Sequence, residues 1–173
     1  MDERTQNLIA ECERQEESCL YMSTTIFEWL KSLRRWRFAF VVVPIVLGGL
    51  ATWPLLTQKT ELEWFTGVCA LLAGLTPAVY KALELDVNLK ALASTAHQFK
   101  ILQDRFRQAS RVTALGGFDD FKKEVDALME RIDTAREGSI TAPERFFKKA
   151  QQKIKSGDYA FSVDMQQTAA PLA

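Results

Sequence analysis

Hydrophobic residues gather in two blocks of the chain, and stretches with a helical alternation of polar and apolar positions lie on either side. Residues 38–58 are 21 consecutive positions without a charge, and residues 64–80 are 17 more. Because a helix rises ~1.5 Å per residue, the two blocks would be about 31 and about 25 Å long, against a bilayer hydrocarbon core of ~30 Å. We therefore predict two membrane-spanning helices.

Two other interpretations account less well for these blocks. A buried hairpin in a soluble protein of 173 residues would need cover on every face, and the rest of the chain has too little apolar surface to supply it. The apolar core of a cleaved signal peptide follows a short basic stretch, whereas 37 polar or amphipathic residues precede the first block. We expect both blocks to be retained.

The short link between the blocks, residues 57–63, forces an antiparallel hairpin. Basic residues flank the opposite ends of the two blocks: Lys31, Arg34, Arg35, Arg37, Lys81 and Lys90. The link itself contains a single cation, Lys59. The positive-inside rule then predicts that both chain termini lie in the cytoplasm and that the link lies outside.

Small residues within the blocks leave flat patches for contact between helices: Gly48, Gly49, Gly67, Ala70 and Gly74. The last three are three and four positions apart, so they share one helix face. This face can pack the hairpin against itself or against another membrane helix, and both uses stay open. Neither block contains an acidic, basic or histidine side chain, which argues against a proton relay or an ion-coupled transporter.

An apolar stripe with alternating spacings of four and three precedes the first block and predicts an amphipathic helix. Its members are Leu8, Cys12, Gln15, Cys19, Met22, Ile26, Trp29 and Leu33. Gln15 weakens the stripe, and the low helix propensity of residues 23–25 can break it. Whether this helix runs unbroken into the first span stays open at this point.

A second stripe follows the second block: Leu85, Leu89, Leu92, Ala96, Phe99, Leu102, Phe106 and Ala109. We expect its helix to continue directly from the second span and to end at Gly116-Gly117. Such a stripe either forms the core of one chain or faces a copy of the same chain. Core packing is favoured for any single residue, and self-association for the assembly as a whole.

Two more helices are expected in the C-terminal part. Asp119 or Asp120 would cap the first, whose apolar stripe ends before Gly138. Residues 141–144 match a capping box with Pro143 in the first turn of the second helix, which Gly157 ends. The stripe of the first helix consists of Phe121, Val125, Leu128, Ile132 and Ala135.

These patterns together predict an all-α membrane protein with a two-helix transmembrane hairpin and a cytoplasmic helical bundle. Residues 1–36 would form the cytoplasmic N-terminal helix and residues 37–82 the hairpin. Residues 83–158 would form the cytoplasmic helical region, and residues 159–173 a flexible tail.

Composition and motifs offer little catalytic chemistry. The 22 basic and 22 acidic residues give zero net charge, which excludes an overall basic footprint for duplex nucleic acid. The single histidine, His97, has no positional support for a catalytic triad. The three cysteines are interpreted as small hydrophobic residues in a reducing compartment. We therefore predict no enzyme activity, no cofactor, no metal site and no direct binding of nucleic acid.

Basic side chains gather at the entry to the first span and on the last helix: Arg34, Arg35, Arg37, Arg145, Lys148, Lys149, Lys153 and Lys155. Attraction to anionic lipid headgroups is the simpler interpretation, at ~1 kcal/mol per basic residue near the surface. A docking surface for an acidic partner or a nucleotide is the alternative.

The order of these parts resembles the bacterial SLATT family. The residues that carry the resemblance are RRWRFAF at 34–40, HQFKILQDRFR at 97–107 and PERFFKKAQQKIKSGDYAFSVD at 143–164. The family comprises two-transmembrane effectors associated with nucleotide-synthesising SMODS and nucleotide-sensing SLOG proteins. The resemblance implies assembly in the bacterial inner membrane and permeabilisation when a partner signals infection. It implies no particular ligand-binding residues.

The expected function is that of a self-associating, multi-pass inner-membrane effector in an anti-phage defence system, which depolarises the membrane when triggered. The partners implied are the lipid bilayer, further copies of the chain, and a nucleotide-signalling or reverse-transcriptase protein encoded nearby. Thr52, Thr66 and Thr76 are the hydroxyls well inside the spans, so a pore lining would be weakly polar and could gate by dewetting. The alternative is a non-conducting anchor or scaffold whose cytoplasmic helices bind another protein.

Overall fold

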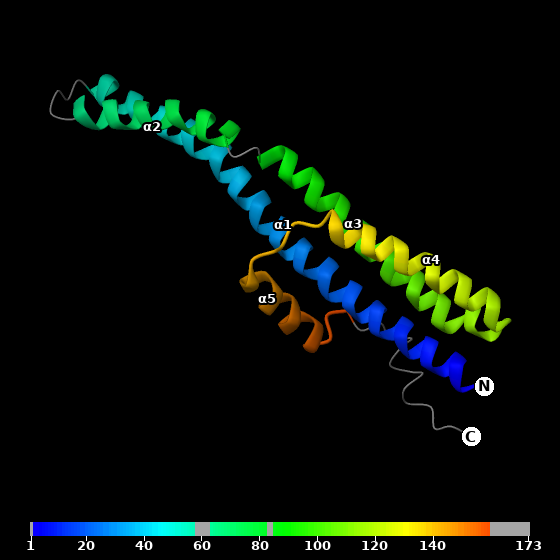
Figure 1. Ribbon diagram of the computed structural model, residues 1–173. Helices are drawn as coiled ribbons and strands as arrows, with labels where there is room; N and C mark the ends of the chain where they lie inside the picture. Colours follow the sequence, from blue (N-terminus) through cyan, green and yellow to red (C-terminus); the bar gives the residue numbers. More distant parts are fainter. Residues whose placement is uncertain (1, 58–62, 83–84, 160–173) are drawn as a thin grey trace. The chain divides into compact units, whose positions relative to one another are not determined.

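A computed structural model describes residues 2–57, 63–82 and 85–159 (Figure 1). Every regular element in these ranges is a helix, which confirms the all-α fold class. The elements are α1 (Glu3–Thr57), α2 (Glu63–Ala82), α3 (Leu85–Arg111), the 3₁₀ turn η2 (Thr113–Leu115), α4 (Phe118–Glu137) and α5 (Glu144–Lys155). The predicted link and the predicted tail lie outside the described residues, except for 57, 63 and 159.

The chain divides into two compact units, and α1 contributes to both of them. The first unit combines the chain up to Trp29 with the chain from Leu92 onward, and the second extends from Leu30 to Ala91. The first therefore contains the N-terminal half of α1, most of α3, and α4 and α5. The second contains the rest of α1, α2 and the first turns of α3.

Helix α1 passes through residues 23–25 without a break, so the hypothesis that these residues interrupt the helix is wrong. The hydroxyl of Ser23 donates to the carbonyl oxygen of Leu20 at 3.1 Å, and that of Thr25 donates to the carbonyl oxygen of Tyr21 at 2.7 Å. Bonds of this kind satisfy the hydroxyls inside the helix, although they compete with regular helix formation in isolated segments. Packing of this segment in the first unit overrides its low propensity.

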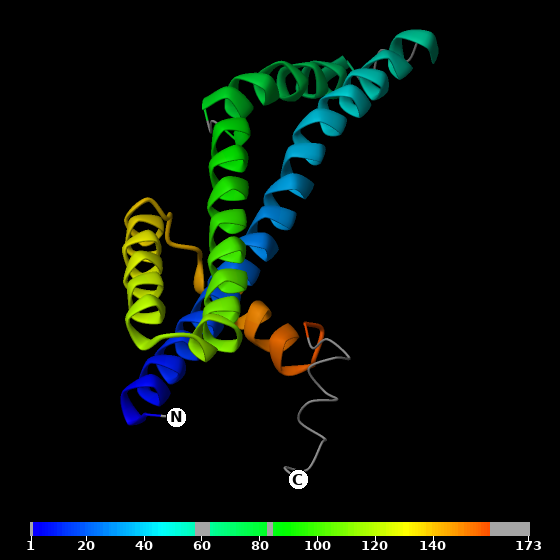
Figure 2. The ribbon, with the colours of Figure 1, turned by 90° about the vertical axis from the view of Figure 1, so that its right-hand side faces the viewer.

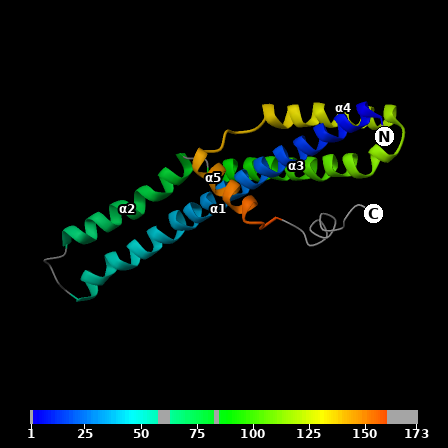
Figure 3. The same cartoon turned by 90° about the horizontal axis from the view of Figure 1, so that it is seen from below.

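The apolar stripes form the core of the first unit, in which α3 and α4 lie side by side (Figures 2 and 3). From α3, the buried stripe members of this unit are Leu92, Ala96, Phe99, Leu102, Phe106 and Ala109. All five predicted positions of α4 are buried with them: Phe121, Val125, Leu128, Ile132 and Ala135. Their burial needs no second copy of the chain. Leu89 is buried in the second unit, and the side chain of Leu85 lies outside the described residues.

Helix α3 ends earlier than the sequence suggested, at Arg111 and not at the Gly116-Gly117 pair. The turn η2 follows, and its exit is closed by a hydrogen bond from the Gly116 amide to the carbonyl oxygen of Thr113 at 3.0 Å. The prediction that Asp119 or Asp120 caps α4 is also wrong. Gly117 is the N-cap residue of α4, and the two carboxylates lie in the first helical turn. There their negative charges interact favourably with the positive end of the helix dipole.

The ends of α5 agree only in part with the prediction. Pro143 is the N-cap residue and not part of the first turn, and no side chain caps this end. The C-terminal end is closed by Gly157, whose φ is +84°. The amides of Gly157 and Asp158 donate to the carbonyl oxygens of Ile154 and Lys153, the arrangement of a Schellman motif. The left-handed backbone explains why glycine stands there.

The expected continuation of the second span into the next helix falls partly outside the described residues. Helix α2 ends at Ala82 and α3 begins at Leu85, and residues 83 and 84 are not described.

Candidate functional site

Two helices are long and apolar enough to span a membrane, the first within α1 and the second being α2. Only 6% of the most apolar 18-residue window of each helix is buried. A core helix of a soluble protein would have most of such a window buried. This exposure therefore argues against the alternative of a hairpin hidden in a soluble core.

Large apolar side chains point outward along both helices of the second unit. Ile45 of α1 is 70% exposed and Trp64 of α2 is 71% exposed. The other exposed members are Trp36, Phe38, Val41, Val43, Val46, Leu50, Val68, Leu71, Leu72, Leu75 and Val79. Ala51 and Cys69 are buried, and the rings of Phe40 and Tyr80 lie 6.3 Å apart between the two helices.

The small-residue positions of the two helices face open space. At Gly48, Gly49, Gly67 and Gly74 an added Cβ would have no atom within 4 Å, other than the helix's own backbone and the neighbouring residues. Ala70, on the same face as two of them, is exposed. These residues are therefore not what packs α1 against α2.

Two threonine hydroxyls in these helices are bonded to the backbone of their own helix. Thr52 donates to the carbonyl oxygen of Gly49 and Thr76 to that of Leu72, each at 2.7 Å. A threonine bonded in this way keeps little donor capacity for water or an ion. The exposed surface of the two helices is consequently almost entirely apolar, and it begins after the exposed basic cluster of Arg34, Arg35 and Arg37.

The first unit contains a buried acidic residue that the sequence analysis did not single out. The side chain of Glu28 is 1% exposed; one carboxylate oxygen accepts a hydrogen bond from Lys153 at 2.9 Å, and the other forms an ion pair with Lys149 at 2.8 Å. Both lysines belong to α5. The hydrogen bond from Lys153 to Glu28 is the main reason that the pKa of this lysine is raised.

Aromatic side chains surround this ion-pair cluster of Glu28, Lys149 and Lys153. Trp29 of α1 stacks on Phe146 of α5 with 6.4 Å between ring centroids, and the ring of Tyr21 lies 6.1 Å from that of Phe147 in a tilted arrangement. The guanidinium of Arg145 lies over the ring of Phe146 at 4.8 Å. Helix α5 is thus fastened to α1 by apolar contacts and by charge at once.

The predicted basic surface of α5 is therefore divided by the fold. Lys149 and Lys153 contact α1, while Lys148 pairs with Glu144 on its own helix at 2.8 Å and is 72% exposed. Arg145 and Lys155 are exposed. A local signal pointed to this arrangement: Glu28 is the single charged residue between Cys19 and Leu30, and Lys149 and Lys153 are four positions apart on one helix face.

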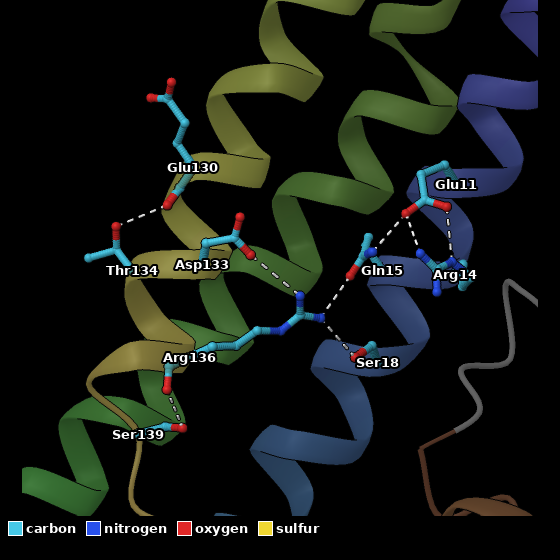
Figure 4. Close-up of polar contacts among 9 residues, drawn as sticks. All are labelled: Glu11, Arg14, Gln15, Ser18, Glu130, Asp133, Thr134, Arg136 and Ser139. Atoms are coloured by element: carbon cyan, nitrogen blue, oxygen red, sulfur yellow. Dashed lines mark hydrogen bonds and ion pairs between the residues drawn. The ribbon is translucent and has the colours of Figure 1, made fainter.

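A second polar contact joins α4 to α1 (Figure 4). Gln15 is buried within the apolar stripe, and both ends of its amide are bonded. Its nitrogen donates to Glu11 at 2.7 Å, and its oxygen accepts from Arg136 at 3.0 Å. The guanidinium of Arg136 also pairs with Asp133 at 3.6 Å. Gln15, which weakens the stripe in the sequence, therefore fixes the register of α4 on α1.

The cysteines of the first unit are poorly suited to act as nucleophiles or metal ligands. Cys12 and Cys19 are fully buried free thiols, and desolvation raises the pKa of each to about 11. The thiolate form that reacts or binds metals is thereby disfavoured. His97 is exposed with its ring edge-on to Phe27 at 5.4 Å. Among the described residues, no group of three or more His, Cys, Asp or Glu side chains could hold a metal ion.

No family model, curated protein or solved structure matches this chain.

Proposed function

We propose that residues 38–57 of α1 and the whole of α2 are embedded in a lipid bilayer. The observation that carries this proposal is the exposure of thirteen large apolar side chains on these helices and at their entry. Burying half of such a side chain is worth about 1 kcal/mol, so leaving them all in water costs roughly 10–20 kcal/mol. That equals or exceeds the typical net stability of a folded domain, about 5–15 kcal/mol. The hydrocarbon core removes this cost.

The orientation follows from the basic residues next to these helices. Arg34, Arg35 and Arg37 are exposed on α1 just before the apolar segment, and Lys81 is exposed at the end of α2. The positive-inside rule places this end, and with it the first unit, in the cytoplasm. The resemblance to the SLATT family supports the inner membrane of a bacterium as the membrane concerned.

The proposed activity is permeabilisation of that membrane by several copies of the chain, as an effector in anti-phage defence. The unfilled space at Gly49, Gly67 and Gly74 supports close approach of another helix, because association in lipid depends on packing between small residues. The resemblance to the SLATT family supplies the biological context and a nucleotide-signalling or reverse-transcriptase partner.

The experiment that tests this function uses the full chain in liposomes loaded with a fluorescent ion indicator. Insertion is checked first, by resistance of the protein to alkaline extraction from the vesicles. Ion leak that rises more steeply than linearly with the protein-to-lipid ratio would support a self-associated pore. An inserted protein without leak, alone or in cells that contain its genetic neighbours and an infecting phage, would contradict the effector function.

The second candidate is a non-conducting membrane anchor whose cytoplasmic unit binds another protein. The specific observation in its favour is that Thr52 and Thr76 spend their hydroxyl hydrogens on backbone carbonyls. The described surface of the two helices then presents few hydrogen-bond donors to water or ions. Insertion without leak is the result that would favour this candidate.

A further inference from the structure

Helix α5 is both strongly basic and amphipathic. It is short and strongly basic, with five cations among its 12 residues, and it has an apolar face that includes Phe146 and Ala150. Basic amphipathic helices of this kind bind to the surface of anionic membranes. In this structure, however, the apolar face and two of the cations are directed at α1.

The contact that holds α5 on α1 is a buried carboxylate between two lysines. Glu28 is 1% exposed, whereas its partners Lys149 and Lys153 keep 45% and 33% of their side chains exposed. The buried carboxylate therefore needs cations beside it, and α5 supplies two of them, because a buried ion without compensation is strongly disfavoured. The lysines do not depend on Glu28 in the same way, because water or another anion can replace it.

The position of this contact in the chain brings a competing anion close. Glu28 stands two residues before Leu30, where the membrane-associated unit begins, and ten residues before the uncharged segment. If α1 enters the bilayer as proposed above, the headgroups lie about 15 Å from Glu28 along the helix, at ~1.5 Å per residue. The connection of residues 138–143 between α4 and α5 contains no helix, so α5 can move as a unit.

We propose that α5 is a releasable arm: Glu28 holds its two lysines in the docked state, and the anionic headgroups of the membrane compete with Glu28 for the same two lysines. Release allows the apolar face of α5 and its lysines to bind the lipid surface. It also uncovers Trp29 and the carboxylate of Glu28, which precede the uncharged segment of α1 by nine and ten residues. This inference rests on the proposed membrane insertion and adds to it a lipid-sensitive change in the cytoplasmic unit.

The experiment measures release through a thiol placed under the arm. Ala150 is fully buried in the docked state, and Ala150→Cys is a small change. A maleimide reaches this thiol only after α5 has left α1, so its labelling rate reports the released fraction. The full-length variant is reconstituted in vesicles of phosphatidylcholine, with or without phosphatidylglycerol, and the labelled peptide is quantified by mass spectrometry. The exposed Ser156→Cys variant controls for access of the reagent.

Phosphatidylglycerol is expected to raise the labelling rate of Ala150→Cys by about tenfold or more, because each lysine gains ~1 kcal/mol at an anionic surface. Glu28→Gln in the same background should raise the rate even in phosphatidylcholine alone. Lys149→Gln should do the same if Glu28→Gln disturbs folding. The matched control is Lys148→Gln, which makes the same change of charge on the same helix but pairs with Glu144 and not with Glu28.

Equal labelling rates in the two kinds of vesicle would overturn the proposal, as would equal effects of Lys148→Gln and Lys149→Gln. Inorganic phosphate at matched ionic strength should leave the rate unchanged. A rise as large as with phosphatidylglycerol would overturn the assignment to a membrane surface. Alkaline extraction of the same vesicles separates the two levels of the argument: a protein that does not insert contradicts the proposed function, while an inserted protein with unchanged labelling contradicts only the arm.

Discussion

Replacement of Leu92 by aspartate should unfold the first unit. Leu92 belongs to the stripe of α3 and is 2% exposed. Truncating a buried leucine to alanine costs about 2–5 kcal/mol. The aspartate adds the cost of burying a polar group without a partner, roughly 2–7 kcal/mol for a neutral group and more for a charged carboxylate. The lower limits already sum to about 4 kcal/mol, and the middle of the range matches the entire stability of a typical domain, about 5–15 kcal/mol.

The same helix offers a matched control. Ile101 is nine residues further along α3 and is 50% exposed, so Ile101→Asp introduces the same charge where water can solvate it. We expect a change within about 0.5–1 kcal/mol for this variant, as for other exposed positions. Leu92→Ala provides the intermediate step, with a melting temperature lowered by about 5 °C or more at several degrees per kcal/mol.

Thermal unfolding of the full chain in detergent micelles, followed by circular dichroism and by limited proteolysis, measures all three variants. From the highest to the lowest melting temperature, the expected order is Ile101→Asp, Leu92→Ala and Leu92→Asp. The protease should digest the Leu92→Asp protein even without heating. If Leu92→Asp melted together with Ile101→Asp, Leu92 would be solvated in the folded protein. The account of the first unit as a core built inside one chain would then be refuted.

Three further predictions concern other parts of the chain. Gly74→Leu should reduce depolarisation of cells that express the protein without reducing its amount in the membrane, because the leucine side chain fills the space left for another helix. The control Leu71→Ile should leave depolarisation nearly unchanged, and a voltage-sensitive dye measures both variants. The buried thiols of α1 have a pKa of about 11 against an ordinary value of 9.0, so their neutral forms contribute stability that is complete below pH 9 and is lost as the pH rises to about 11. Denaturant titrations across that range should show the loss, and a flat profile would contradict the burial of these thiols. Gly157→Ala should cost about 1 kcal/mol at the end of α5, because its φ is +84°; Gly138→Ala, at φ −80°, should cost less, and hydrogen exchange of the nearby amides distinguishes the two.

The local patterns of this protein could be predicted from its sequence because helix geometry alone determines them. Spacings of three and four place Phe99 and Phe106 on one side of α3, and the structure buries both. The same geometry identified the stripe of α4, and the length of the two uncharged blocks identified the two apolar helices. The physical reason is that 3.6 residues per turn link positions a few residues apart, wherever the rest of the chain lies.

Helix ends followed the sequence less closely, since competing signals lie within a few residues of one another. The Gly116-Gly117 pair marked a break, but α3 had already ended at Arg111. The weak helix formers at residues 23–25 suggested another break, and none occurs there. A hydroxyl that bonds to its own backbone fits a helix or a turn, and only the surrounding packing decides between them.

The contacts between distant segments were decided by the tertiary structure alone. Gln15 accepts its hydrogen bond from Arg136, 121 residues away in sequence, and Glu28 accepts one from Lys153, 125 residues away. Many lysines and arginines could in principle have paired with Glu28, because charge attraction carries little information about sequence position. Once the stripes had packed, the fold left Glu28 in the interior facing α5, where burial makes the choice of partner specific.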